Sequence, residues 1–179
     1  MKRWEVLDSR YLLERRWLKV REDCVRTSSG HVIDEYHVLE TPCWACVCCV
    51  TQGQQLVLIE QYRHGRGALT WELPAGVLEG TETPLEGAQR ELREETGYAA
   101  EQWTDLGWLT PEPARATNRA YLFAATGAAR VDEQALDDSE DVRVHLVPLD
   151  AVDELLAERR IEHAVHVAAL LLAKQRGLR

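Results

Sequence analysis

Three glutamates near the middle of the chain have the spacing of a binding site. Glu91, Glu94 and Glu95 occur within the stretch RELREETG, residues 90–97. If this stretch is helical, positions i, i+3 and i+4 lie on one face, so the three carboxylates share that face. A like-charge pair at i, i+4 costs about 0.2–0.5 kcal/mol. The spacing therefore raises the question of which cation offsets the repulsion.

The end of the predicted helix makes this placement more costly. Gly97 is typical of the residue just past a helix, because glycine adopts the left-handed conformation at little cost. Glu94 and Glu95 then lie in the last turn, beside the negative end of the helix dipole, where each costs about 0.3–1 kcal/mol. A segment chosen for helix stability would carry lysines here. We therefore expect a bound cation at this face, rather than a solvated acidic surface.

The start of the same helix is marked by local signals. Thr83, Pro84 and Glu86 supply an N-cap threonine, a proline at the first helical position and a glutamate at the third, which together form a capping box. Gly87 costs about 1 kcal/mol relative to alanine inside a helix, which suggests a close approach at that position. The residues expected to face the core are Leu85, Ala88 and Leu92.

The remaining pattern predicts one mixed β-sheet covered by helices, an α/β (α+β) architecture. The strands and the turn at Ser28-Ser29-Gly30 predict a hairpin before residue 40. We expect an N-terminal β extension over 1–40 and a single structural unit over 41–179. The later expected strands span 44–51, 55–62, 103–110, 119–126 and 142–148, and the later expected helices span 150–159 and 162–176.

Composition and charge exclude several classes of protein. The 179 residues carry 21 basic and 30 acidic side chains, a net charge of −9, which argues against binding nucleic acid through its phosphates. The longest apolar run, AVHVAALLLA, has ten residues and is too short to span a bilayer. The start, MKRWEVLDSR, has no apolar signal region, so we expect a cytoplasmic protein with no membrane partner.

Four of the five cysteines lie in TPCWACVCCVTQ. Cys43 and Cys46 form a C-x-x-C, which also occurs in zinc and redox sites. No second C-x-x-C follows, and the spacing of Cys46, Cys48 and Cys49 suits a strand in which cysteine replaces valine as a small buried hydrophobe. We expect a packing role, with a cysteine-based metal or redox module as the rival interpretation.

A longer pattern surrounds the three glutamates and resembles the Nudix box. The stretch GVLEGTETPLEGAQRELREETGY, residues 76–98, meets every fixed position except that Tyr98 occupies a place that is more often aliphatic. Glu82 is expected to brace the loop or to hold an outer metal ion. The matching positions are Gly76, Glu82, Arg90, Glu91, Leu92, Glu94, Glu95 and Gly97.

The resemblance implies a fold, a cofactor and a set of ligands. The fold would be an α/β/α sandwich with a mixed sheet, and the cofactor Mg²⁺, with Mn²⁺ as a possible substitute. Carboxylate oxygens suit these hard cations better than zinc. Glu91 and Glu95 would be principal metal ligands, joined by Glu94 and the backbone carbonyl of Ala75. Arg90 would orient a box glutamate through a charge-assisted hydrogen bond.

Flanking stretches narrow the resemblance to one branch of the family. EQYRHG (60–65) and WELPAG (71–76) are similar to the ADP-ribose and nucleoside diphosphate-sugar pyrophosphatases, and Pro113 stands fifteen residues after Tyr98, where that branch usually has a proline. The glycine that often follows this proline is missing, so ADP-ribose need not be the preferred substrate. The branch implies a small nucleotide-sugar substrate, cleaved to a nucleoside monophosphate and a sugar phosphate.

The same branch suggests further site residues and a homodimer with an exchanged N-terminal sheet. Glu140, in an acidic loop, matches the general base, with Glu133 as a second candidate. Arg63 is a candidate phosphate or ribose clamp, or else a member of a structural ion pair. Trp17 and Tyr36 are candidates to contact the base across the dimer, although either could be an ordinary core or interface residue.

Two rival functions share these features. A house-cleaning hydrolase of nucleoside triphosphates or capped RNA ends would use the same box, but the proline and the net acidity disfavour it. A non-catalytic sugar-nucleotide sensor would be expected to lose box glutamates or to carry a DNA-binding domain, and this sequence does neither.

Overall fold

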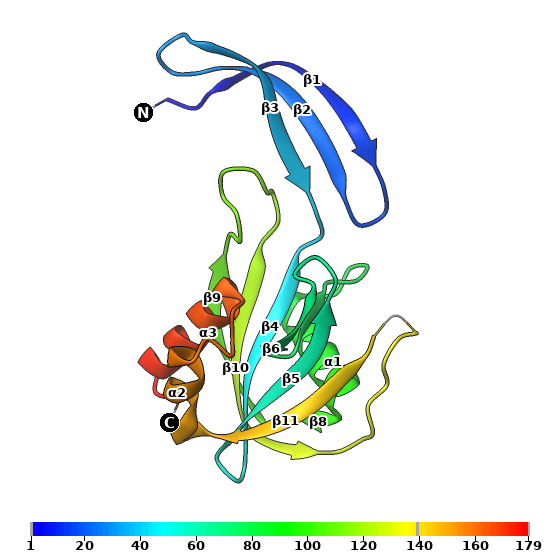
Figure 1. Cartoon of the computed structure of the whole chain (residues 1–179), viewed down its shortest axis with the longest axis vertical. Helices are drawn as coiled ribbons and strands as arrows, with labels where there is room; N and C mark the ends of the chain where they lie inside the picture. Colours follow the sequence, from blue (N-terminus) through cyan, green and yellow to red (C-terminus); the bar gives the residue numbers. More distant parts are fainter. Residues whose placement is uncertain (1, 139, 179) are drawn as a thin grey trace. The chain divides into compact units, whose positions relative to one another are not determined.

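The computed structural model describes residues 2–138 and 140–178. It divides the chain into two compact units, each described here by itself (Figure 1). The first unit comprises Met1–Cys43 and Thr110–Arg119, and the second comprises Trp44–Leu109 and Ala120–Arg179. The expected boundary at residue 40 lies close to the end of the first segment. The contribution of the segment from residue 110 was not anticipated.

The first unit is a three-stranded antiparallel sheet in the order β1-β2-β3. The expected hairpin is confirmed, and Gly30 turns it with a left-handed φ of 90°. The second segment of the unit lies beside the end of the last strand. The Leu39 N–H donates to the Arg115 carbonyl at 2.8 Å, and the Thr117 N–H donates to the Leu39 carbonyl at 3.0 Å. The strands are β1 (Glu5–Glu14), β2 (Lys19–Arg26) and β3 (Val32–Glu40).

The second unit contains an eight-stranded mixed sheet with the central order β11-β5-β4-β10-β8. β4 and β10 run parallel, and the other pairs are antiparallel. The short strands β6, β7 and β9 pair with β5, β4 and β10. The strands are β4 (Trp44–Thr51), β5 (Gln55–Arg63), β6 (Ala68–Glu72), β7 (Ala75–Val77), β8 (Tyr98–Ala99), β9 (Gln102–Leu109), β10 (Ala120–Arg130) and β11 (Val142–Pro148).

Strand β4 is buried on both faces, and its alternation divides the core into two layers. Cys46 and Cys48 belong to one hydrophobic cluster, and Val47 and Cys49 belong to the other. Burial raises the pKa of the Cys46 and Cys49 thiols to about 12, so both stay protonated and apolar. The interpretation of this run as a buried strand is confirmed.

Helices cover both faces of the sheet, which confirms the expected α/β/α arrangement (Figure 1). The predicted helix over 150–159 is instead a short 3₁₀ turn followed by α2. No side-chain cap supports its start, and Arg159 ends it with a positive φ of 58°. No helix in the described part of the chain is long and apolar enough to cross a membrane. The helices are α1 (Pro84–Thr96), α2 (Val152–Ala157) and α3 (Ala164–Gln175).

Candidate active site

The box folds as β7, a loop and α1 in succession. The expected capping box is confirmed, since the Glu86 N–H donates to the Thr83 hydroxyl at 3.3 Å and the Thr83 N–H donates to the Glu86 carboxylate at 2.7 Å. The helix is followed by Gly97, whose left-handed φ is 75°. These local features set the helix bounds, and with them the face on which the glutamates lie.

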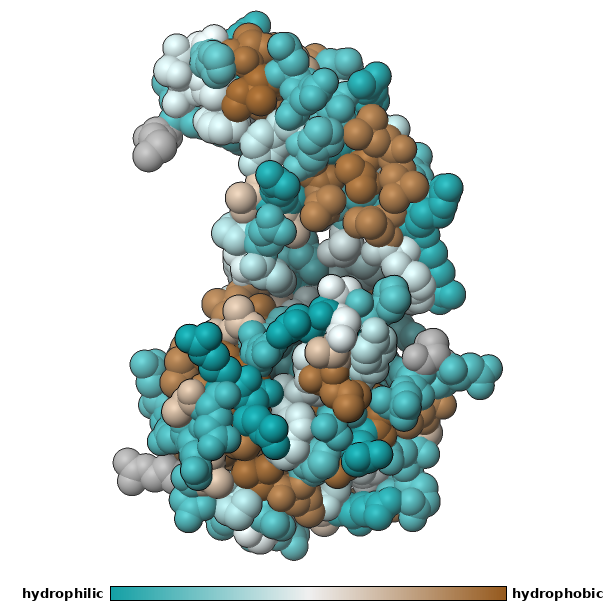
Figure 2. Space-filling view, in the orientation of Figure 1, coloured by the Kyte–Doolittle hydropathy of each residue, from teal (hydrophilic) through white to brown (hydrophobic). Residues whose placement is uncertain are grey.

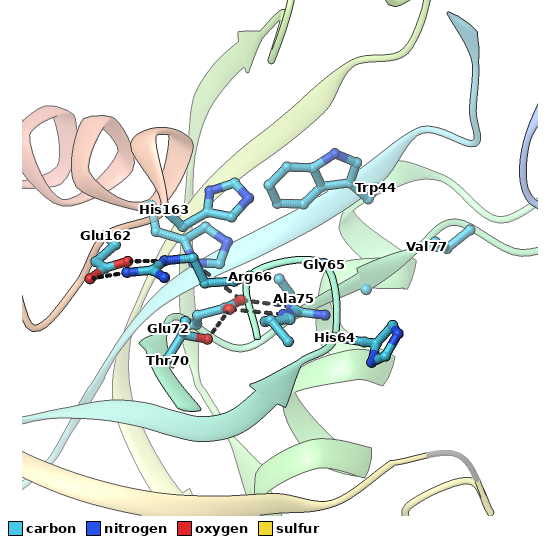
Figure 3. Close-up of a pocket in the computed structure, with 13 residues that line it drawn as sticks. Trp44, His64, Gly65, Arg66, Thr70, Glu72, Ala75, Val77, Glu162 and His163 are labelled. Atoms are coloured by element: carbon cyan, nitrogen blue, oxygen red, sulfur yellow. Dashed lines mark hydrogen bonds and ion pairs between the residues drawn. The ribbon is translucent and has the colours of Figure 1, made fainter. Parts of the chain in front are cut away.

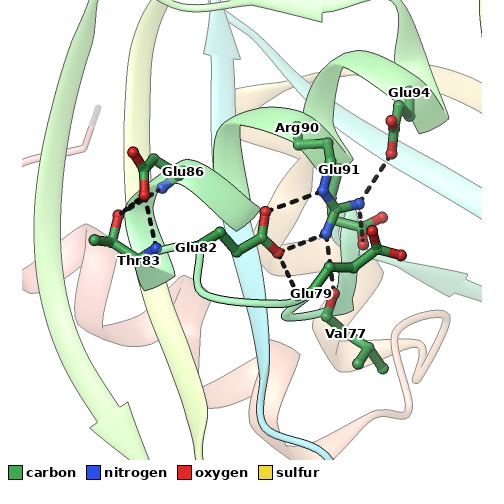
Figure 4. Close-up of polar contacts among 8 residues, drawn as sticks. All are labelled: Val77, Glu79, Glu82, Thr83, Glu86, Arg90, Glu91 and Glu94. Atoms are coloured by element: carbon green, nitrogen blue, oxygen red, sulfur yellow. Dashed lines mark hydrogen bonds and ion pairs between the residues drawn. The ribbon is translucent and has the colours of Figure 1, made fainter.

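Arg90 connects the helix to the loop before it (Figure 4). Its Nη1 donates to Glu91 Oε1 at 2.8 Å and to Glu94 Oε2 at 3.0 Å. Its Nη2 donates to Glu82 Oε1 at 2.8 Å and to the Val77 carbonyl at 3.0 Å. The guanidinium thus positions two box glutamates, and Glu82 braces the loop through it. The predicted orienting contact between Arg90 and a box glutamate is present.

Two of the box carboxylates are buried. Glu95 is 3% exposed and accepts the Ala75 N–H at 2.8 Å. Burial raises the pKa of Glu95 well above its usual value, and the nearby Glu91 charge adds to the increase. Glu91 is 8% exposed, and burial raises its pKa to about 7 in spite of its contact with Arg90. Such groups ionise readily only when a further positive charge lies beside them.

Two glycines make room for these side chains. A Cβ added at Gly76 would overlap the Glu91 carboxylate, so the strand and the glutamate can approach only because this side chain is missing. A Cβ added at Gly87 would meet Leu78 Cδ2 at 2.5 Å and Glu82 Oε1 at 2.9 Å. The close approach expected at Gly87 is confirmed, and it explains a glycine inside the helix.

Glu91 and Glu94 line a small cavity of about 170 Å³, called the acidic cavity below. Glu140 contributes to this cavity, and its Oε2 accepts the Asp137 N–H at 3.0 Å. The predicted general base therefore lies in the same cavity as Glu91 and Glu94, although it is far from them in sequence. The lining residues are Glu79, Arg90, Glu91, Glu94, Ala135, Asp137 and Glu140.

The donor set of the acidic cavity fits a hard divalent cation. Within residues 2–138 and 140–178, no three histidine, cysteine, aspartate or glutamate side chains lie close enough together to hold a metal ion as placed. Arg90 instead contacts Glu91 and Glu94, and the Ala75 N–H contacts Glu95. The candidate donors are all oxygens, three glutamate carboxylates and the Ala75 carbonyl, and the burial of Glu91 and Glu95 favours a cation beside them.

A larger cavity of about 570 Å³, called the histidine cavity below, includes all three residues of β7 in its lining (Figure 3). Gly76 lines this cavity and also abuts Glu91, which lines the acidic cavity, so the two cavities are neighbours. The lining residues are Trp44, Arg63, His64, Gly65, Arg66, Thr70, Glu72, Ala75, Gly76, Val77, Glu162, His163 and His166.

Arg63 and Glu72 form a bidentate pair in the wall of the histidine cavity. The Arg63 Nε and Nη2 atoms donate to the two carboxylate oxygens at 2.8 and 2.6 Å. Burial favours the neutral form of Glu72, but the hydrogen bonds from Arg63 and Thr70 outweigh it and lower the pKa of Glu72. The structural ion pair considered for Arg63 is present, and its role as a clamp stays a prediction.

Three aromatic residues of this cavity were missed in the sequence analysis. The rings of His163 and His166 stack with centroids 4.2 Å apart, and Trp44 meets them edge-on at 5.4 and 5.6 Å. The i, i+3 spacing of the two histidines at the start of a helix was the available signal. The proximity of Trp44 left no signal, because it depends on packing between distant segments.

The remaining candidates lie elsewhere. Trp17 and Tyr36 belong to the N-terminal unit; the Trp17 side chain is exposed under the Arg16 guanidinium, and the Tyr36 hydroxyl donates to the Ala114 carbonyl. Glu133 pairs with Arg130 at 2.5 Å and lines a separate cavity together with Arg90 and Glu94. Of the two candidate bases, Glu140 is the one that lines the acidic cavity with Glu91 and Glu94.

Comparison with known proteins identifies the family of both parts of the chain. The NUDIX domain model matches residues 41–170, and the model of the nucleoside diphosphate sugar hydrolase N-terminal domain matches residues 4–39. The methanol dehydrogenase activator of Bacillus methanolicus is 32% identical over 156 residues, covering 87% of this chain and 84% of that protein. An ADP-ribose pyrophosphatase of Bacillus subtilis is 30% identical over 151 residues, covering 76% and 82%.

A solved structure shows the same fold. An ADP compounds hydrolase superposes with a TM-score of 0.86 at 22% identity, covering 100% of this chain and 98% of that one. The expected Nudix fold is therefore confirmed. With its complete box and a family match over most of its length, this chain belongs to the Nudix family and is a pyrophosphatase of that family.

Proposed function

We propose that this pyrophosphatase uses a divalent cation, Mg²⁺ with Mn²⁺ as a substitute, to hydrolyse the diphosphate of nucleoside diphosphate sugars, ADP-ribose among them. The products would be a nucleoside monophosphate and a sugar phosphate. The observation that carries the proposal is the position of β7, whose Gly76 lines the histidine cavity and also abuts Glu91. A diphosphate held at the glutamates would thus have a cavity beside it for the next part of the substrate.

In this proposal Glu91, Glu94 and Glu95 hold the cation, together with the carbonyl of Ala75. Bound there, the cation would neutralise the diphosphate and activate the attacking water. Arg90 would release the oxygens needed for binding and keep the carboxylates oriented through its remaining contacts. The raised pKa values of Glu91 and Glu95 support this assignment, since burial has kept both side chains away from the solvent that would otherwise stabilise their charge.

In this proposal Glu140 would accept the proton of the attacking water, and Arg63 would bind a phosphate. Glu140 lines the acidic cavity, from which its carboxylate can accept a proton from the attacking water. The Arg63 side chain is 45% exposed, and its pair with Glu72 leaves the Nη1 group outside the two hydrogen bonds. That group can donate to a phosphate oxygen while Glu72 holds the guanidinium in place.

A substrate panel tests this function. The purified protein is incubated with Mg²⁺ and ADP-ribose, UDP- and GDP-sugars, dinucleotides or nucleoside triphosphates, and the products are identified by chromatography. We expect nucleoside monophosphate and sugar phosphate from at least one sugar nucleotide, and no reaction in EDTA. Release of pyrophosphate from triphosphates, with every sugar nucleotide intact, would overturn the substrate assignment.

We further propose a homodimer formed through the N-terminal sheet. This sheet exposes large hydrophobic side chains (Figure 2), and β1 leaves one ten-residue edge unpaired within the part of the chain that the structure describes. Exposed apolar residues on an open edge favour association. Trp17 and Tyr36 would then contact the base of a substrate bound by the other subunit. The exposed residues are Trp4, Val6, Leu7, Tyr11, Leu12, Trp17 and Val32.

Light scattering after size exclusion tests the dimer. The expected mass is twice the 20.4 kDa of one chain. Leu12→Asp should shift the protein toward the monomer, and Trp17→Ala should raise KM for ADP-ribose without changing the mass. A monomeric wild-type protein with full activity would rule out this arrangement.

A further inference from the structure

The histidine cavity contains a half-buried imidazole, His163, and a buried one, His166, that the proposed chemistry does not use. His163 is the N-cap residue of α3 but makes no side-chain capping bond, and His166 lies one turn later with 1% exposure. Their rings stack at 4.2 Å with an interplanar angle of 22°, and Trp44 lies edge-on to both. The three rings form one wall of the cavity (Figure 3).

Each imidazole has a nitrogen without a protein partner. His166 Nδ1 accepts the Leu73 N–H at 3.3 Å, so the neutral ring carries its hydrogen on Nε2. Among the described residues, His166 Nε2 and His163 Nδ1 are buried and make no hydrogen bond to the protein. An unsatisfied buried polar atom costs about 1–3 kcal/mol. Leucine or alanine would fill a purely structural position without this cost.

The two histidines of this cavity are uncharged. Burial lowers the pKa of both histidines, and the neighbouring ring and Arg63 lower that of His166 further, to about 3. Both imidazoles are therefore neutral at physiological pH. A neutral imidazole offers one donor and one acceptor, and it suits a hydroxyl group, which can both donate and accept. The two arginines of the cavity lining, Arg63 and Arg66, are each paired with a glutamate.

The histidine cavity also lies next to the box glutamates. Its lining includes Ala75 and Val77 of β7, whose backbone groups bond Glu95 and Arg90 of the box. A substrate whose diphosphate lies at the box therefore extends its next group into this cavity. Its volume of about 570 Å³ is within the range of small-molecule sites.

We propose that the histidine cavity is the subsite for the sugar of the substrate, and that Trp44, His163 and His166 determine which sugar is accepted. Sugar hydroxyls would pair with His166 Nε2–H and His163 Nδ1, and an apolar face of the ring would pack on Trp44. A nucleobase is the other group that could fill the cavity; the two imidazole nitrogens, both free for hydroxyls, favour the sugar. This inference rests on the proposed function.

Two substrate series separate a sugar subsite from a base subsite. One series varies the sugar on a constant base (ADP-ribose, ADP-glucose and ADP-mannose), and the other varies the base on a constant sugar (ADP-, UDP- and GDP-glucose). In His163→Ala and His166→Leu we expect KM for sugar nucleotides to rise at least tenfold with kcat within threefold. The differences in kcat/KM across the sugar series should shrink, and those across the base series should remain. The β-methyl ester of ADP, which has no sugar at this end, should be cleaved equally by all variants.

A matched control variant comes from another stacked histidine. His145 stacks on Trp71 with centroids 4.4 Å apart and does not line the cavity, so His145→Ala should leave both series unchanged. Thermal unfolding of each variant checks the fold. If His166→Leu fails to fold, His163→Ala decides the test, because His163 lies at the helix end and is not fully buried.

Calorimetric titration with ribose 5-phosphate and glucose 1-phosphate gives an independent readout. We expect the wild type to bind one of them and His163→Ala to bind it at least tenfold more weakly. If the wild type cleaves no sugar nucleotide, the proposed function fails, while loss of sugar phosphate binding in the variant would still support the subsite. If sugar nucleotides are cleaved and the variants keep the wild-type order of sugars, or lose discrimination among bases instead, the subsite assignment is wrong.

Discussion

The guanidinium of Arg63 and the carboxylate of Glu72 lie in a bidentate pair, with Nε–Oε1 at 2.8 Å and Nη2–Oε2 at 2.6 Å. The carboxylate is 2% exposed while the arginine side chain is 45% exposed. The buried carboxylate thus fixes the position of a guanidinium that is still partly exposed to solvent. The register of the antiparallel strands places Glu72 opposite Ile59 and Arg63 opposite Ala68, so the arginine side chain reaches along the hairpin to the carboxylate.

Removing one partner of this pair should be worse than removing both. Arg63→Ala leaves a buried charge on Glu72, and we expect a loss of about 2–3 kcal/mol, less than for a fully buried pair because solvent reaches the arginine. Arg63→Ala combined with Glu72→Gln should recover most of the stability but not the activity. Urea denaturation and sugar-nucleotide kinetics measure both; equal stability of the single and double variants would contradict the prediction.

Glu95→Gln should separate activity from stability. Loss of a carboxylate ligand forfeits several kcal/mol of transition-state stabilisation, so we expect kcat to fall roughly a thousandfold. The fold should remain, because the amide oxygen can still accept the Ala75 N–H. Glu101→Gln, at an exposed position, is the control. Wild-type turnover by Glu95→Gln would show that this residue is not a metal ligand.

Glu91→Gln should be more stable than the wild type at pH 8 in EDTA. The pKa of Glu91 is raised from 4.5 to about 7 in the folded protein, so its contribution to stability is present below pH 4.5 and is lost as pH rises to 7. A neutral amide avoids this loss, worth about 1–3 kcal/mol. Thermal unfolding at pH 8 and pH 5 measures the difference, which should be small at pH 5.

Metal addition provides the matching experiment. At pH 8, Mg²⁺ should raise the Tm of the wild type more than that of Glu91→Gln, because only the wild type places an ionised carboxylate there. An identical rise in both proteins would indicate that Mg²⁺ binds without Glu91.

Gly76→Ala should strongly reduce activity through a single added methyl group. The added Cβ would overlap the Glu91 carboxylate and displace it, and a displacement of about 1 Å can reduce the rate roughly a hundredfold. At Gly53 the nearest atoms to an added Cβ are 3.7 Å away, so Gly53→Ala is the control. Steady-state kinetics and circular dichroism suffice; full activity in Gly76→Ala would mean that the strand moves freely away from the helix.

His166 should make the wild type sensitive to mild acid. Its pKa is lowered from 6.5 to about 3, so the unfolded chain binds a proton that the folded protein does not. The stability from this group is complete above pH 6.5 and is lost as pH falls toward 3. Between pH 7 and pH 4 the wild type should lose about 2–3 kcal/mol more than His166→Leu. Glu91 and Glu95 act in the opposite direction in both proteins, so the difference measured by urea denaturation isolates His166.

The local part of this site could be predicted from the sequence. The glutamate face, the capping box and the terminal Gly97 depend on backbone preferences and contacts within a few residues. The buried strand β4 was predictable for the same reason, since the alternation of side chains is a property of any strand. The spacing of the box also determined the family, because its fixed positions occur together within one short segment.

Tertiary structure alone decided what surrounds that helix. Leu73 and His166 are 93 positions apart, yet sheet order and the packing of α3 bring them into hydrogen-bond contact. The same holds for Trp44 beside the two histidines, and for the segment from Thr110 that joins β3. Such contacts depend on which strands become neighbours and in what register. Strand order and register depend on packing throughout the core, so they cannot be predicted from any short stretch of sequence.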